Sequence, residues 1–198
     1  MLRLRPFKAC DAPDIVSWTE DETAFRLWSA DRFPSYPITA EELNRHYEAM
    51  ADSDSFYEFT AFDENGPVGH LIMRFTDAQK KTLRFGFVIV DRAKRGRGYG
   101  REMLALSIRY AFDILKADRI TLGVFEQNEP AHRCYRAAGF TEVPGEVPVY
   151  YRIGLEAWRC LEMALEKADW ARRERRESDA RDHTDGPADP PGNERRGL

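Results

Sequence analysis

Arginine and glycine alternate in the most distinctive stretch of the sequence, which runs from Arg95 to Arg101 as Arg-Gly-Arg-Gly-Tyr-Gly-Arg. Glycines let the backbone approach a ligand closely and turn several N–H groups into one concavity. Aliphatic residues precede this turn and an amphipathic pattern follows it, so a helix N-terminus would add its partial positive charge to the arginines. This combination predicts a site for phosphate.

Two common phosphate-binding signatures do not fit this turn. A P-loop ends in Gly-Lys-Ser or Gly-Lys-Thr, whereas Gly100 is followed here by Arg101 and Glu102. A dinucleotide-binding fingerprint needs another glycine three residues after Gly98, and Arg101 stands there. A tight strand-to-helix turn on a solvated face would explain a single glycine pair, but three glycines interleaved with arginines favour the anion site.

A second group of residues further along the chain also combines structure with chemistry. Asn128 is a good helix N-cap residue, Pro130 fits the first turn, and Gly139 fits a helix end. Tyr135 would lie on one face of this helix, where ordinary packing is one reading of it. Cys134 faces elsewhere and has no partnered base, so we interpret it as a packing residue.

Together the two groups resemble the GNAT superfamily of N-acetyltransferases. The family's pyrophosphate signature is Arg or Gln, two residues, Gly, one residue, then Gly or Ala. Its second motif is Asn-x-x-Ala-x-x-x-Tyr followed by Gly-Phe. The matching positions are Arg95, Gly98 and Gly100 for the first motif, and Asn128, Ala131, Tyr135, Gly139 and Phe140 for the second. The resemblance covers roughly residues 2–165.

The resemblance implies an acetyl-CoA-dependent N-acetyltransferase. Such an enzyme moves the acetyl group to a primary amine, of a small molecule or a peptide N-terminus, by direct attack in a ternary complex. The implied fold is α/β (α+β), with a mixed, mostly antiparallel twisted sheet of about seven strands flanked by helices and splayed between the fourth and fifth strands. The implied cofactor contacts are Ile89, Val90, Arg95, Gly96, Arg97, Gly98, Tyr99, Gly100, Arg101 and Asn128.

The same resemblance gives several of these residues a role. Main-chain groups of Ile89 and Val90 would pair with the pantetheine arm as a false strand, and amides there could steady the oxyanion. Arg97 and Arg101 would add charge-assisted contacts to the pyrophosphate, with ordinary surface arginine as the alternative. A purely structural role as N-cap is as well supported for Asn128 as a cofactor contact.

Catalysis needs a proton donor and a proton acceptor. By the resemblance, the Tyr135 hydroxyl, with a pKa of about 10, would return a proton to a departing thiolate of pKa about 8.5. Deprotonating an alkyl ammonium at pH 7 costs roughly 4–5 kcal/mol, so a base normally assists. The family often places a Glu on the strand before the glycine turn, but residues 80–87 contain none. We predict that Glu126 replaces it as the base, with a solvated loop carboxylate as the alternative interpretation. Among the histidines, only His70 is a candidate site residue.

Hydrophobic periodicity predicts the elements that position these residues. Thr39 to Glu42 matches a capping box, and Asn65-Gly66 suits a tight hairpin turn. The aromatic segment Trp18–Tyr36 would border the acceptor side in this family, with helix packing as the alternative. The expected strands are Leu2–Arg5, Phe56–Phe62, Val68–Phe75, Leu83–Val90, Ile120–Phe125, Phe140–Val143 and Trp158–Leu165, and the expected helices cover Asp11–Trp18, the segment after Thr39, the segment through Leu104 to Leu115, and Asn128–Ala138.

Composition narrows the function classes. The net charge of −4 over 198 residues argues against nucleic acid as the main partner. No signal peptide or membrane-length apolar run is visible, and three unpaired cysteines indicate neither a disulfide framework nor a metal, so we expect a cytoplasmic protein without membrane association. We expect an acetyltransferase domain over residues 1–168 and a disordered charged tail over 169–198, in a monomer or homodimer.

Two other function classes remain open at this point. One is a non-catalytic module of the same fold that binds or senses acyl-CoA, which the missing strand carboxylate allows and Tyr135 disfavours. The other is a nucleotide-binding protein that uses the glycine turn for a different phosphate. Thermal protection by CoA, compared with ATP or NAD, would separate them.

Overall fold

The computed structural model describes residues 1–145, 147 and 149–184. Within them one eight-stranded sheet has the order β1-β2-β3-β4-β5-β8-β6, with β7 paired to β8. Every pairing is antiparallel except β4 with β5. The strands are β1 (Arg3–Pro6), β2 (Phe56–Asp63), β3 (Gly66–Phe75), β4 (Thr82–Val90), β5 (Arg119–Phe125), β6 (Thr141–Glu142), β7 (Val149–Ile153) and β8 (Glu156–Glu166).

Helices and short helical turns connect the strands. They are η1 (Ala9–Asp11), α1 (Ala12–Ser17), α2 (Glu22–Ser29), α3 (Ala40–Glu48), η2 (Arg92–Lys94), α4 (Tyr99–Arg109), the π-helical turn η3 (Tyr110–Ile114), α5 (Glu129–Ala138) and α6 (Lys167–Thr184). The capping box is confirmed, because the Thr39 hydroxyl accepts from the Glu42 amide and the Glu42 carboxylate accepts from the Thr39 amide. The helix after Asn128 is confirmed as α5, with Gly139 at its C-cap in the left-handed region.

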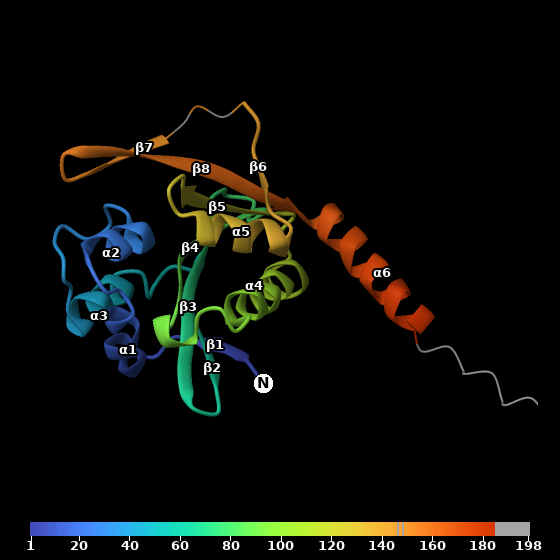
Figure 1. The fold of residues 1–198 in the computed structure, drawn as a ribbon, viewed down its shortest axis with the longest axis horizontal. Helices are drawn as coiled ribbons and strands as arrows, with labels where there is room; N and C mark the ends of the chain where they lie inside the picture. Colours follow the sequence, from blue (N-terminus) through green and yellow to red (C-terminus); the bar gives the residue numbers. More distant parts are fainter. Residues whose placement is uncertain (146, 148, 185–198) are drawn as a thin grey trace, which may run out of the picture.

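The helices cover the sheet on two faces (Figure 1). On one face, α4 and α5 bury Met103, Leu104, Ile108 and Tyr135 in the larger of two apolar cores. On the other, α1, α2 and α3 form a second core with β3 and β4, built around Ile15, Phe25, Trp28 and Leu43. The sheet therefore separates the glycine turn and Tyr135 from the aromatic N-terminal helices, except where its strands part.

The strands part between β4 and β5. The two pair in parallel only from Thr82 with Arg119 to Phe85 with Leu122, although β4 continues to Val90 and β5 to Phe125. A bulge lies at the same level, since the register of β3 against β4 shifts between His70 and Ile72. Phe87 in this bulge has a φ of 48°. The expected mostly antiparallel sheet, splayed between its fourth and fifth strands, is confirmed.

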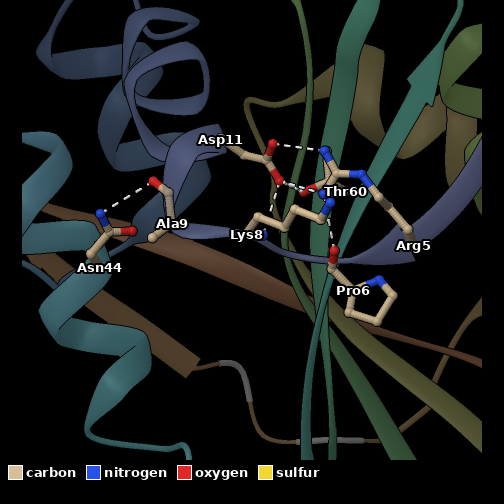
Figure 2. Close-up of polar contacts among 7 residues, drawn as sticks. All are labelled: Arg5, Pro6, Lys8, Ala9, Asp11, Asn44 and Thr60. Atoms are coloured by element: carbon tan, nitrogen blue, oxygen red, sulfur yellow. Dashed lines mark hydrogen bonds and ion pairs between the residues drawn. The ribbon is translucent and has the colours of Figure 1, made fainter.

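A polar cluster joins β1, β2 and the entry to α1 (Figure 2). The Asp11 carboxylate, 2% exposed, accepts two hydrogen bonds from the Arg5 guanidinium at 2.7 and 2.8 Å, one from the Thr60 hydroxyl at 2.8 Å and one from the Lys8 amide at 3.0 Å. Burial works against ionisation of this carboxyl, but these donors outweigh it and hold the pKa of Asp11 below its usual value. The cluster fixes β1, β2 and the entry to α1 to one another.

Three elements differ from the expectations. The segment Glu22–Ser29 forms α2, with the Asp21 side chain accepting from the Ala24 amide, where only an aromatic stretch was recognised. The strand β7 was not predicted. The tail from residue 169 was expected to be disordered, yet α6 extends to Thr184, and the rest of the expected tail lies outside the described residues.

Side-chain contacts attach the first turns of α6 to the rest of the domain. Its Trp170 ring packs against Phe112 with centroids 5.2 Å apart, and Arg173 donates to the Ala137 carbonyl at 3.1 Å. These contacts lie in its first turns, after which the helix projects away from the sheet (Figure 1). The dense charge that suggested disorder is also compatible with a solvated helix.

Candidate functional site

The glycine turn presents free main-chain donors. Gly96 and Gly98 have φ of 76° and 87°, and Gly98 is the N-cap of α4. The first helical bond runs from the Glu102 amide to the Gly98 carbonyl, so the amides of residues 99–101 precede it and have no intrahelical acceptor. Apart from the adjacent residues, no atom of the described residues lies within 4 Å of the position that a Cβ would take on Gly96 or Gly98. The turn therefore offers N–H groups and open space together, as an anion requires.

Two side chains around the turn are hydrogen-bonded to neighbouring residues, and two others are exposed arginines. The Tyr99 hydroxyl donates to Asp63 at 2.8 Å, and Arg95 Nε donates to the Val90 carbonyl at 3.2 Å. Arg97 and Arg101 are exposed, and neither has an ion-pair partner among the described residues. Of the predicted contacts, Tyr99 can thus offer only its main chain, whereas Arg97 and Arg101 keep their full charge available.

One edge of β4 is unpaired beyond Phe85. Main-chain groups alternate in direction along a strand, and the Asp91 amide donates to Val68 in β3, so Val88 and Val90 face the opposite, open edge. Ile89 faces β3 by the same alternation. Sequence reasoning chose Ile89 and Val90 and missed Val88, because the direction of each peptide depends on the register with β3.

A small cavity of about 50 Å³ lies where the strands part, and we call it the tyrosine cavity. Val88, Asn128 and Tyr135 contribute to its wall. Burial raises the pKa of Tyr135, with minor contributions from two nearby cysteines, so the hydroxyl is protonated at neutral pH. Within the described residues that hydroxyl has no hydrogen-bond partner. Asn128 both lines the cavity and caps α5 through the Ala131 amide at 3.3 Å, so its two predicted roles are geometrically compatible.

A second cavity of about 380 Å³ opens on the other face of the sheet, and we call it the aromatic cavity. Six residues line both cavities: Leu27, Trp28, Phe85, Gly86, Phe87 and Gly123. Trp28 Nε1 donates to the Phe87 carbonyl at 2.9 Å and so ties α2 to the bulge. The two cavities therefore adjoin through the gap between β4 and β5.

Positive charge dominates the polar part of the aromatic cavity, which Arg32, His46, Arg74 and Arg84 line. Arg84 donates to Glu162 at 2.5 Å. Burial lowers the pKa of His46, and the neighbouring Arg32 lowers it further, so its imidazole is neutral at pH 7. Burial also lowers the pKa of Arg74, followed by the charges of Arg84 and Arg32.

Two other predicted residues lie outside both cavities. Glu126 forms an ion pair with Arg159 at 3.1 Å and lines a separate surface hollow. His70 is fully buried, and its Nε2 lies 2.6 Å from the Tyr47 hydroxyl in the second core, where burial lowers its pKa to about 3. His46 and Arg74 belong to no recognisable motif, because only the folded sheet brings them beside Phe87.

The described residues contain neither a candidate metal site nor a candidate membrane-spanning helix. No group of three or more His, Cys, Asp or Glu side chains is arranged to hold a metal ion. No helix in this part of the chain has the length and apolar character to cross a bilayer.

Comparison with known proteins identifies relatives of the chain. The family model described as Acetyltransferase (GNAT) domain matches residues 1–141. The L-amino acid N-acetyltransferase AaaT of Escherichia coli is 32% identical over 103 residues, which are 50% of this chain and 60% of that protein. The SPbeta prophage-derived uncharacterized N-acetyltransferase YokL of Bacillus subtilis is 27% identical over 106 residues, 53% of this chain and 59% of that protein. The chain thus spans about three fifths of these relatives.

Solved structures share the fold at low sequence identity. The spermidine N-acetyltransferase of Vibrio cholerae, crystallised with CoA and spermine, superposes with a TM-score of 0.73. The match covers 86% of this chain and 98% of that one at 19% identity. At that identity the likeness establishes the architecture alone.

Proposed function

The chain belongs to the acetyltransferase (GNAT) family, and on that premise we propose that it transfers the acetyl group of acetyl-CoA to a primary amine of a small molecule or a peptide N-terminus by direct attack within a ternary complex. The observation that carries the proposal is the gap between β4 and β5. There the tyrosine cavity, on the side of the glycine turn, adjoins the aromatic cavity on the opposite face. Two reactants could approach from the two faces and meet at the shared residues.

The residues on the cofactor side suit acetyl-CoA. The free amides at residues 99–101 and the exposed Arg97 and Arg101 suit a pyrophosphate. The open edge at Val88 and Val90 suits the amide groups of a pantetheine arm, although the Val90 carbonyl is already bonded to Arg95. This path leads from the glycine turn to Tyr135.

Acetyl-CoA would supply an acetyl group activated as a thioester. The amine nitrogen would form a bond to the carbonyl carbon, the carbon–sulfur bond would break, and the sulfur would leave as a thiolate. Tyr135 would donate its proton to that sulfur. Burial raises the pKa of Tyr135, so the hydroxyl is protonated and available as a donor when the thiolate forms.

The attacking amine must be neutral, and its proton needs an acceptor. His46 is the neutral imidazole of the aromatic cavity, so we include it as an acceptor beside Glu126. Glu126 is exposed and bonded to Arg159, which places its carboxylate in another hollow. Substituting each residue separately distinguishes them.

The acceptors of the relatives differ in charge, since AaaT is named for L-amino acids and the V. cholerae enzyme for spermidine. We therefore propose a thiol-release assay with acetyl-CoA and a panel of amino acids, short peptides and polyamines. Amine-dependent release supports an enzyme. Thermal protection by CoA without release from any amine would instead favour the binding module, and equal protection by ATP or NAD would favour a general nucleotide site.

A further inference from the structure

We propose that the acceptor is an α-amino acid with an apolar side chain, and that Arg74, with Arg32 beside it, binds the carboxylate in the aromatic cavity. The inference rests on the proposed acetyl transfer and names its acceptor class. Three properties of the cavity carry it: its uncompensated charge, the cost of that charge to the fold, and its apolar walls.

The charge of the aromatic cavity is not balanced. Among the described residues that line it, none is an Asp or a Glu, whereas three are Arg32, Arg74 and Arg84. Glu162 of β8 forms an ion pair with Arg84 at 2.5 Å. Neither Arg32 nor Arg74 has a carboxylate partner within the described part of the chain. An anion in the cavity would therefore meet two available guanidinium groups, and a polyamine would meet repulsion.

The position of Arg74 costs the sheet stability. Arg74 in β3 and Arg84 in β4 stand directly opposite one another, where like charges destabilise a pair of strands. Arg74 is only partly exposed, so some of its hydration is also lost. A residue that weakens the fold in this way is typical of a binding site, because its ligand restores the missing counter-charge.

The geometry along β3 fits an acceptor of amino-acid size. Ile72 stands opposite Gly86 beside the bulge, and Arg74 follows two residues later on the same face, roughly 7 Å along the strand. An α-amino acid can direct its amine toward the shared residues and its carboxylate toward Arg74. The arginine reaches such a group with two parallel N–H donors.

Aromatic side chains form part of the remaining wall. Phe56, Phe125 and Tyr151 join Trp28 and Phe87 around the cavity, whereas the ring of Phe85 packs against Phe140 in the other core. A volume of about 380 Å³ lies near the lower end of the range for small-molecule sites. These walls favour an apolar side chain such as that of phenylalanine or leucine.

The test compares two matched acceptors, L-phenylalanine and L-phenylalaninamide, with spermidine as a third. The amide has the less basic amine, so a larger fraction of it is neutral and able to attack. Basicity alone would therefore favour the amide, the opposite of what we expect. We expect kcat/KM for the acid to exceed that for the amide roughly 10- to 100-fold, the range for a hydrogen bond to a charged group. In Arg74→Gln, KM for the acid should rise by a similar factor with kcat nearly unchanged, and the preference should vanish.

Arg152→Gln is the matched control. Arg152 is exposed and adjoins Tyr151 in β7, but alternate residues of a strand point to opposite faces, so its side chain lies outside the cavity. This variant should keep the preference. The unfolding midpoint of Arg74→Gln without ligand should equal or exceed that of the wild type, since the opposed charges are removed, whereas a purely structural Arg74 would lower it.

Each contrary outcome is distinct. Equal or better turnover of the amide or of spermidine would overturn the acceptor class while leaving acetyl transfer in place. A preference retained in Arg74→Gln, or a lowered midpoint, would overturn the role of Arg74. Failure of all three amines, together with release of thiol from another amine, would reject the acceptor class alone. Failure with every amine would reject acetyl transfer as well.

Discussion

Trp28 and Phe87 join the two halves of the site through one hydrogen bond, from the indole Nε1 to a buried carbonyl at 2.9 Å. Phe87 has a φ of 48°, so the bulge of β4 holds a conformation that costs energy and needs support from its neighbours. The ring of Trp28 also packs edge-on against Phe87 at 5.3 Å. Helix α2 therefore supports the segment where the two cavities adjoin.

Trp28→Phe should destabilise the protein by about 1–3 kcal/mol, because the Phe87 carbonyl loses its donor while remaining buried. Urea unfolding of the two proteins measures this difference. Trp158→Phe is the matched control, since its indole donates to the exposed Glu156, and its loss should be below about 1 kcal/mol. Equal losses of unfolding free energy in both variants would show that the hydrogen bond to the Phe87 carbonyl contributes no more than a surface one.

Gly98→Val should abolish binding of acetyl-CoA, because the added side chain occupies the open space beside the free amides. At a hundredfold excess over the dissociation constant, binding should stabilise the wild type by about 2.7 kcal/mol, and the variant not at all. Gly154→Val controls for backbone strain, since Gly154 also has positive φ, at 59°, and no described atom beyond its chain neighbours lies within 4 Å of its Cβ position. Protection that persists in Gly98→Val would place the ligand elsewhere.

Tyr135→Phe should lower turnover by about 10²–10⁴-fold with little change in cofactor affinity. The substitution keeps the ring, which packs at 6.1 Å from Phe140, and removes only the hydroxyl, which has no partner among the described residues. Because a thioester sulfur accepts hydrogen bonds poorly and a thiolate accepts them well, the lost interaction belongs to the transition state. Single-turnover rates within about threefold of the wild type would remove Tyr135 from the catalytic residues.

His46→Gln and Glu126→Gln test the two proton acceptors. A base works only when deprotonated, so a His46 mechanism predicts that kcat/KM falls as the pH drops through its pKa, which burial and Arg32 place below 6.5. This fall of kcat/KM at low pH should disappear in His46→Gln and persist in Glu126→Gln. If only Glu126→Gln lost it, Glu126 would be the proton acceptor.

Asp11→Asn should lower the free energy of unfolding at pH 7 relative to the wild type, and the difference should shrink as the pH falls. The folded-state pKa of Asp11 is depressed, so its contribution is complete above the unfolded-state value of about 3.9 and is lost as the pH falls toward the folded-state pKa. Denaturation curves from pH 6 to pH 2 should therefore converge for the two proteins at low pH. A constant difference across that range would contradict the assigned ionisation.

The glycine turn, α5 and the strands from β2 to β5 could be predicted because their signals are local. Asn65-Gly66, the Thr39 capping box and the alternation around Gly98 each act within a few residues. The role of α6 could not be derived this way. Its charged sequence has little apolar content, and only the distant Phe112 shows why Trp170 packs there.

The acceptor side was the part of the site that the sequence predicted least well. Arg74 and His46 belong to different elements and are unremarkable in the sequence, and it is the register of β3 on β4 that sets Arg74 opposite Arg84. The base predicted from the sequence, Glu126, follows the end of β5, whereas the neutral imidazole in the cavity comes from α3. Such groupings depend on long-range packing that no short motif encodes.

The most direct measurement of acetyl transfer is a single-turnover reaction of the protein with acetyl-CoA and L-phenylalanine, followed by mass spectrometry of both the amine and the protein. Direct attack predicts one N-acetylated amine for each thiol released, with the protein itself unmodified throughout. Thiol release without an acetylated amine, or an acetyl group passing through Cys134 or another side chain, would contradict the account.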